Sequence, residues 1–295
     1  MDWALITLMG TVMFGLVSVF DKILLSRYMP SVKIFYLLTG IAQLVISLAA
    51  LTLVSWGDDL TSSIVGVSVI SGLLCGLGLT CLFYGIARMD VSLAIPIYHT
   101  FPVFVSLFAM LLLGDTISLG QWLGIFLTVA GAGLVGISQR WGAWNNTPIP
   151  PQFIVLFGAI LTASSYVTYK YALLGMDFWN LFVIRTGCVS IMLIAFGLSR
   201  KTFSDLRKVI DNRMGLTPFL FTEGLLASTA VLLTVLGLAI GPVALASTLM
   251  ATRPVFVLIF SGIFSIKRIG MVNEPFTRGT VPWKVLSTIV NRGRD

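Results

Sequence analysis

Long apolar runs are the feature that most limits how this chain can fold. Nine runs contain few charged side chains, and about 20 such residues cross the hydrocarbon core of a bilayer as a helix. Because lipid offers no hydrogen bonds to the backbone, each run is predicted to be helical. Apolar residues make up 57% of the chain and charged ones 11%, against about 45–50% and 25% in soluble domains, which excludes a soluble globular fold. The predicted spans are 4–20, 34–55, 64–87, 91–113, 121–138, 152–172, 178–198, 217–239 and 243–265.

The length leaves room for little besides these spans. At roughly 25–30 residues per helix and connection, 295 residues predict about ten crossings and no soluble domain. The net charge of +7 comes from basic residues in short connections, where they orient helices, so nucleic acid is not expected as a partner. The segment Met1 to Phe20 lacks a basic start and a small-residue cleavage site, and we interpret it as a retained first helix.

The cysteines do not indicate a metal or cofactor site. Cys75, Cys81 and Cys188 all fall inside apolar runs, no CxxC pair occurs, and the chain has one histidine. Zinc and similar metals need three or four grouped ligands. We therefore predict buried free thiols, no metal and no cofactor.

An internal repeat divides the chain into two halves. Residues 72–105 align with 224–257 without a gap, and Pro102-Val-Phe-Val recurs as Pro254-Val-Phe-Val. With about five crossings per half, the second half enters the membrane from the opposite side, which predicts an inverted repeat. The predicted fold is an all-α integral membrane protein of about ten transmembrane helices in two inverted five-helix repeats. The expected division is 1–140 for the first repeat, 141–151 for a linker and 152–295 for the second repeat.

Several motifs resemble the drug/metabolite transporter superfamily, specifically its EamA-type members with two five-helix repeats. The segments that carry the resemblance are Ala94 to Pro102, Leu111-Leu-Leu-Gly-Asp115, Gln121-Trp-Leu-Gly-Ile125, Gly131 and Gly133, and Asn273-Glu-Pro275. The resemblance implies import or export of small organic solutes such as amino acids, other metabolites or drugs. It also implies a central cavity lined by helices one to four and six to nine, and no cofactor.

The last helix departs from that pattern. Apolar sequence starts at Val281 and ends at Val290, just under three helical turns where at least roughly five are needed to cross. We therefore expect an incomplete final helix. Glycines on the fifth span indicate close helix contacts, either inside one chain, which we favour, or across a homodimer. They are Gly124, Gly131, Gly133 and Gly136.

Charge in the connections predicts an orientation. Basic residues between spans lie in the odd-numbered connections, apart from Lys170. The positive-inside rule then places the odd connections in the cytoplasm and the N-terminus outside. Family members commonly have both ends inside, so the resemblance implies the opposite orientation. The absence of a leader or a long loop is typical of a multi-pass protein of the bacterial inner membrane.

Four ionisable residues within spans are the main candidates for substrate binding or coupling: Glu223, Arg253, Arg185 and His99. A charge at the bilayer centre costs at least about 2.5–3.5 kcal/mol and usually serves a function. We expect His99 and Arg253 at similar depth facing a midplane cavity, with Arg253 binding an anionic group and Glu223 exchanging a proton. The alternative for Glu223 is an ion pair with Arg253 or Arg185 that only joins helices.

Further candidates come from helix ends and breaks. Pro102 and Pro254 remove helical hydrogen bonds and leave carbonyl groups available, and Pro96 is a third break candidate. Lys22 and Lys170 are expected to extend to the interface, with gating or substrate contact as the alternative. Tyr84, Tyr98, Tyr166 and Tyr169 either line the cavity or pack as aromatic anchors.

Two other classes of function compete with transport. An intramembrane enzyme would need a recognisable nucleophile or paired acid and base, and the chain has no Gly-x-Ser-x-Gly and no phosphate-binding loop. A non-transporting membrane scaffold or receptor stays open because the last helix is short. We predict a secondary transporter in the lipid bilayer that moves a small-molecule solute by alternating access, with a proton or another ion as the coupling partner.

Overall fold

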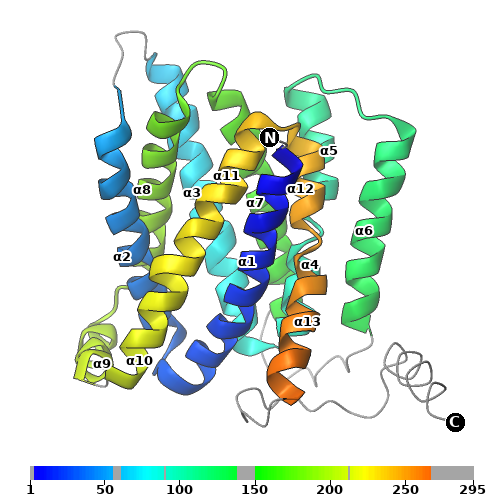
Figure 1. The fold of residues 1–295 in the computed structure, drawn as a ribbon. Helices are drawn as coiled ribbons and strands as arrows, with labels where there is room; N and C mark the ends of the chain where they lie inside the picture. Colours follow the sequence, from blue (N-terminus) through cyan, green and yellow to red (C-terminus); the bar gives the residue numbers. More distant parts are fainter. Residues whose placement is uncertain (1–2, 56–60, 90, 138–149, 212, 267–295) are drawn as a thin grey trace, which may run out of the picture.

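The computed structural model describes residues 3–55, 61–89, 91–137, 150–211 and 213–266, and these residues form a bundle of helices without strands (Figure 1). Eight segments are long and apolar enough to cross a membrane. They are Trp3–Tyr28, Val32–Leu53, Ser62–Arg88, Leu93–Leu112, Pro151–Ala172, Phe178–Gly197, Gly215–Ile240 and Val243–Phe264. The all-helical membrane class predicted from the apolar runs is thereby confirmed for the described residues.

The elements have the following bounds in chain order. They are α1 (Trp3–Ile23), η1 (Leu24–Tyr28), α2 (Val32–Ala50), η2 (Leu51–Leu53), α3 (Ser62–Arg88), α4 (Val91–Tyr98), α5 (Phe101–Leu112), α6 (Leu119–Ile137), α7 (Pro151–Ala172), α8 (Phe178–Gly197), α9 (Arg200–Asp211), α10 (Arg213–Phe219), η3 (Leu220–Ala227), α11 (Ser228–Ile240), α12 (Val243–Met250) and α13 (Arg253–Ile266). Elements η1 and η3 are π-helical, whereas η2 is a 3₁₀ turn.

The count of crossings differs from the expected ten. The predicted span 121–138 is a helix of 19 residues, α6, but it is not among the eight candidate spans. The predicted linker, 141–151, is described only from residue 150, and the short apolar segment 281–290 lies outside the described residues. The described residues therefore contain eight candidate spans, and the other two of the expected ten stay a prediction.

The first helix is longer than the sequence indicates. Asp21 and Lys22 carry charge after an apolar run, and we expected the span to end at residue 20. Instead α1 continues to Ile23 and passes into η1, which ends at Tyr28. The helix continues because Asp21 is fully buried against another helix and Lys22 binds backbone carbonyls. Local charge favours a turn, but these tertiary contacts outweigh it.

Helices from the two halves of the chain pack closely through glycine. Helix α1 lies against α11, and α7 lies against α3. A Cβ on Gly10 would lie 3.1 Å from the Ala230 carbonyl oxygen, and one on Gly158 would lie 3.0 Å from the Gly78 carbonyl oxygen. Small residues permit such close backbone approach in membrane proteins. In Figure 1, α1 runs down from the N-terminus and α7 runs up. The first helix of each half therefore makes a similar glycine contact, but the two helices point in opposite directions.

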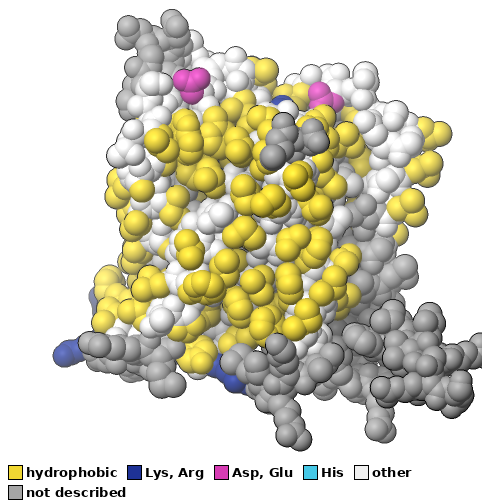
Figure 2. Space-filling model, viewed as in Figure 1, with side chains coloured by type: hydrophobic (Ala, Val, Ile, Leu, Met, Phe, Trp, Pro, Cys, Tyr) yellow, Lys and Arg dark blue, Asp and Glu magenta, His cyan; other side chains and the backbone are white. Residues whose placement is uncertain are grey.

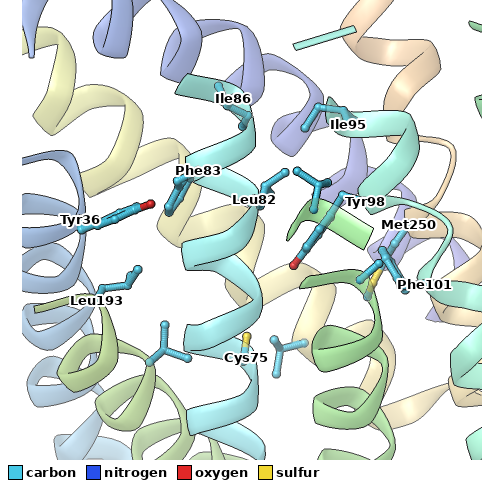
Figure 3. Close-up of a cluster of buried hydrophobic side chains, with 14 of the residues drawn as sticks. Tyr36, Cys75, Leu82, Phe83, Ile86, Ile95, Tyr98, Phe101, Leu193 and Met250 are labelled. Atoms are coloured by element: carbon cyan, nitrogen blue, oxygen red, sulfur yellow. The ribbon is translucent and has the colours of Figure 1, made fainter. Parts of the chain in front are cut away.

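The buried core surrounds α3. Figure 3 shows Tyr98 and Phe101 on one side of this helix and Tyr36 and Leu193 on the other. The outer surface that Figure 2 shows is largely apolar, with acidic groups near its upper rim and most of the visible basic groups at its lower edge. The apolar belt suits lipid contact. The amphipathic helix α9 lies at the lower edge, where four basic side chains occur in its sequence.

Candidate functional site

Two buried carboxyl groups meet where α1 passes η3. Asp21 is 1% exposed and Glu223 is 2% exposed. Their carboxyl groups adjoin each other, with Thr39 of α2 beside Glu223. Neither oxygen of Asp21 has a hydrogen-bond donor within the described part of the chain. We call Asp21 and Glu223 the carboxyl pair. If one member carries a proton, it can donate a hydrogen bond to the other.

The backbone of η3 is unusual where it presents Glu223. Pro218 lies inside α10 and cannot donate a backbone hydrogen bond. The π-helical turns of η3 follow directly, and such turns are rare and often occur at functional sites. Phe221 is exposed while Glu223, two residues later, is buried. The segment η3 thus presents its carboxylate to the core and keeps the Phe221 side chain outside.

Arg253 completes the charged group at this level. It is the first residue of α13, and its Nε donates a 2.7 Å hydrogen bond to the Oγ of Ser18 on α1. Its guanidinium lies 4.8 Å from the centre of the Phe14 ring. Asp21 and Glu223 lie close enough to act on it electrostatically. Its hydrogen bond to a side chain goes to Ser18, and Glu223 acts on it through charge, so the predicted Arg253–Glu223 ion pair stays a prediction.

His99 lies at a break in the fourth span. Helix α4 ends at Tyr98 and α5 begins at Phe101, with Pro102 in its first turn. His99 is buried, and both of its ring nitrogens are without partners among the described residues. Arg253 is near enough for its charge to act on the His99 ring. The structure therefore brings together the two residues that the sequence places at similar depth.

The ninth span breaks at the equivalent position. Helix α12 ends at Met250 and α13 begins at Arg253, followed by Pro254. Helices α12 and α13 lie against α5 and α4, so the two broken spans pack on each other. Because proline has no N–H, each break leaves a preceding carbonyl without its helical partner. Pro96, by contrast, lies within α4 and not at the break.

Arg185 belongs to a second buried group, formed by α3, α7 and α8. Its Nη2 lies 3.0 Å from the Sγ of Cys75. The guanidinium is 5.9 Å from the centre of the Tyr166 ring and 5.4 Å from that of Tyr169. These contacts do not include Glu223, with which one of the predicted alternatives paired Arg185. We call Arg185, Cys75, Tyr166 and Tyr169 the arginine–tyrosine group.

Lys22 and Lys170 bind the C-terminal ends of other helices. The Nζ of Lys22 donates to the carbonyl oxygens of Ile86 and Met89 at the end of α3, at 2.9 and 3.0 Å. The Nζ of Lys170 donates to the carbonyl oxygens of Ala239 and Gly241 at the end of α11, at 2.8 Å each. Cations favour helix C-termini.

The two tyrosines predicted as site residues lie in different places. The hydroxyl of Tyr98 is 2.5 Å from Thr162 Oγ1 on α7, inside the core. Tyr84 lies under Arg88 near the end of α3, with the guanidinium 4.9 Å from the ring centre, and so is outside the buried groups. Tyr98 is therefore part of the buried core, whereas Tyr84 lies near the end of its helix.

Sequence reasoning missed Asp21, Ser18 and Cys75. Asp21 was interpreted as part of a connection, although it follows Ser18 by three residues and Phe14 by seven, which places all three on one helical face. That spacing was the available signal. Cys75 was expected as a buried free thiol, as the structure has it, but its contact with Arg185 has no sequence signal. Of the residues that the structure describes, no three metal-ligating side chains are grouped.

Comparisons with known proteins agree with this architecture. A solved structure titled "Crystal structure of protein" is 14% identical and covers 99% of this chain and 93% of its own, with a TM-score of 0.59, so the two chains share a fold. A search of curated proteins finds no match. The model of the EamA-like transporter family matches residues 1–137 and 150–272. Because these segments cover most of a chain with eight candidate spans, this multi-pass membrane protein belongs to the EamA-like transporter family.

Proposed function

We propose that this protein is a secondary transporter that moves small organic solutes, such as amino acids or other metabolites, by alternating access. The family is one of membrane transporters. The observation that carries the proposal is a group of four buried ionisable side chains. His99 and Arg253 lie at two facing helix breaks, and Asp21 and Glu223 lie where α1 passes η3. Charges inside a membrane protein are costly and typically line a solute or ion pathway.

The proposed architecture is ten helices in two inverted repeats, with 1–140 and 152–295 as the repeats and 141–151 as the linker. Two pairs of equivalent contacts support it. Lys22 binds Ile86 and Met89, and Lys170 binds Leu238 and Gly241. The aligned halves match Ile86 with Leu238 and Met89 with Gly241. Inverted repeats are typical of transporters whose halves move around a central site.

Proton coupling is assigned to the carboxyl pair. With both carboxyl groups ionised, the pair and Arg253 would carry a net negative charge in a buried site, which is unfavourable. One bound proton removes the repulsion between Asp21 and Glu223 and leaves a single negative charge opposite Arg253. Release of that proton changes the charge balance at the junction of α1, η3 and α13. We assign the linkage between solute binding and proton binding to this change of charge in the buried core.

The proposed location is the bacterial inner membrane, with the lower face of Figure 1 in the cytoplasm. Basic residues in the last turns of α1 and α3 and along α9 lie on that face. The positive-inside rule supports this orientation and a first helix that starts outside. A second copy of the chain is not needed for the buried group described above.

Flux in proteoliposomes tests this proposal. A panel of labelled amino acids is supplied with and without an imposed pH gradient, using the unmodified protein and Glu223→Gln. We expect gradient-dependent flux of at least one solute, reduced by at least about tenfold in the variant because the proton site is lost. Asp177→Asn is the matched control, because Asp177 is exposed and makes no capping hydrogen bond. Absence of flux from folded protein, or full coupling in Glu223→Gln, contradicts the proposal.

A further inference from the structure

Arg185 is a buried cation whose surroundings do not balance its charge. It is 4% exposed, and its contacts are the thiol of Cys75 and the ring faces of Tyr166 and Tyr169. Its Nε has no hydrogen-bond partner in the described ranges. Cation–π contacts recover only part of the hydration that a buried guanidinium loses. The described residues around the Arg185 guanidinium therefore supply no negative charge to balance it.

The other buried arginine differs in this respect. Arg253 faces the carboxyl pair, and both Asp21 and Glu223 act on it electrostatically. No carboxylate of the described chain contacts Arg185. Tyr166 lies near enough to feel the charges of both arginines, so the two places are neighbours within one core. Arg253 thus has its counter-charge within the described chain, whereas Arg185 does not.

The backbone around Arg185 is held firmly. A Cβ on Gly72 of α3 would lie 2.6 Å from the Arg185 carbonyl oxygen, so α3 and α8 approach closely at this point. The Oγ atoms of Ser71 and Ser165 each donate to the other's carbonyl at 2.8 Å and join α3 to α7 nearby. A guanidinium fixed on such a frame loses little side-chain entropy when it binds an anion.

We propose that Arg185, with Tyr166 and Tyr169, is the subsite for the carboxylate of the transported solute. The planar guanidinium matches a carboxylate in two parallel hydrogen bonds. One carboxylate neutralises the one unmatched charge, so the solute class is a small organic acid with a single carboxylate facing this site, amino acids included. The tyrosine rings contact the carbon skeleton beside it. This assignment rests on the proposed transport function, because a solute can reach a buried arginine only when alternating access opens the bundle.

Binding to detergent-purified protein tests the assignment without any flux measurement. The probes are matched pairs, L-leucine with L-leucinamide and benzoate with benzamide, and sodium chloride serves as the inorganic anion. Dissociation constants are obtained from ligand-dependent thermal stabilisation. We expect carboxylates to bind the unmodified protein at least about tenfold more tightly than their amides, with chloride unable to replace them.

Variants then separate Arg185 from other arginines. We expect Arg185→Gln to abolish the preference for carboxylates and Arg185→Lys to weaken it, because lysine lacks the planar fork. Arg88→Gln is the matched control, because it removes an arginine–tyrosine contact at an exposed position. Without ligand, Arg185→Gln should melt no lower than the unmodified protein, since it removes an unbalanced charge.

Four results overturn the assignment. They are equal binding of carboxylates and amides, no binding of any carboxylate, a preserved preference in Arg185→Gln, and lower stability of Arg185→Gln without ligand, which would indicate a structural brace. If Arg185→Gln is too unstable to purify, that loss of stability counts as the last of these. Carboxylate binding without flux would instead contradict the proposed transport function and leave the subsite standing.

Discussion

Lys22 and Lys170 make equivalent contacts at opposite ends of the bundle. Each binds carbonyl oxygens that have no partner within their own helix, at the ends of α3 and α11. We predict that Lys22→Met and Lys170→Met each lower the free energy of unfolding by about 1–3 kcal/mol, because the carbonyls are left unsatisfied. Unfolding of purified protein in mixed micelles measures this. Lys33→Met, at an exposed position, should change little, and equal stability of all three variants would show that the contacts are unimportant.

At the scale of elements, the crossing of α3 and α7 depends on glycine. A Cβ on Gly78 would collide with Thr162 and lie 3.0 Å from the Gly158 carbonyl oxygen, whereas one on Gly66 of the same helix meets nothing within 4 Å. We predict that Gly78→Ala costs about 1–3 kcal/mol of stability through overpacking. Gly66→Ala should gain up to about 1 kcal/mol from helix propensity. Thermal unfolding of the two variants compares them directly, and a stabilised Gly78→Ala would mean that α3 and α7 lie farther apart.

The elements also differ in how much of them was predictable. Apolar runs predict the long helices well because a membrane span has a fixed length. The aligned prolines locate the breaks before α5 and α13, since proline acts on the local backbone. The end of α1 was predicted wrongly, because the partner of Asp21 is Glu223, far away in the sequence. The contacts of Arg185 could not be predicted for the same reason, because its neighbours come from α3 and α7, which are distant in the sequence.

Across the whole molecule, the buried charges are proposed to couple proton movement to movement of solute. Linkage is reciprocal, so if a proton gradient drives solute, a solute gradient must drive protons. Both members of the carboxyl pair should be needed for this. The sequence indicates a role for Glu223, whereas only the fold indicates one for Asp21. Removing the Asp21 carboxylate is therefore the sharper test of the carboxyl pair.

The most direct measurement is proton movement driven by a solute gradient in proteoliposomes that contain a pH-sensitive dye. The solute is whichever labelled amino acid the protein carries, and the samples are the unmodified protein, Asp21→Asn, Glu223→Gln and the Asp177→Asn control. We predict an internal pH change with the unmodified protein and the control, and a pH change at least about tenfold smaller in both carboxyl-pair variants. An undiminished pH change in Asp21→Asn, or solute flux without any pH change in the unmodified protein, would contradict this prediction.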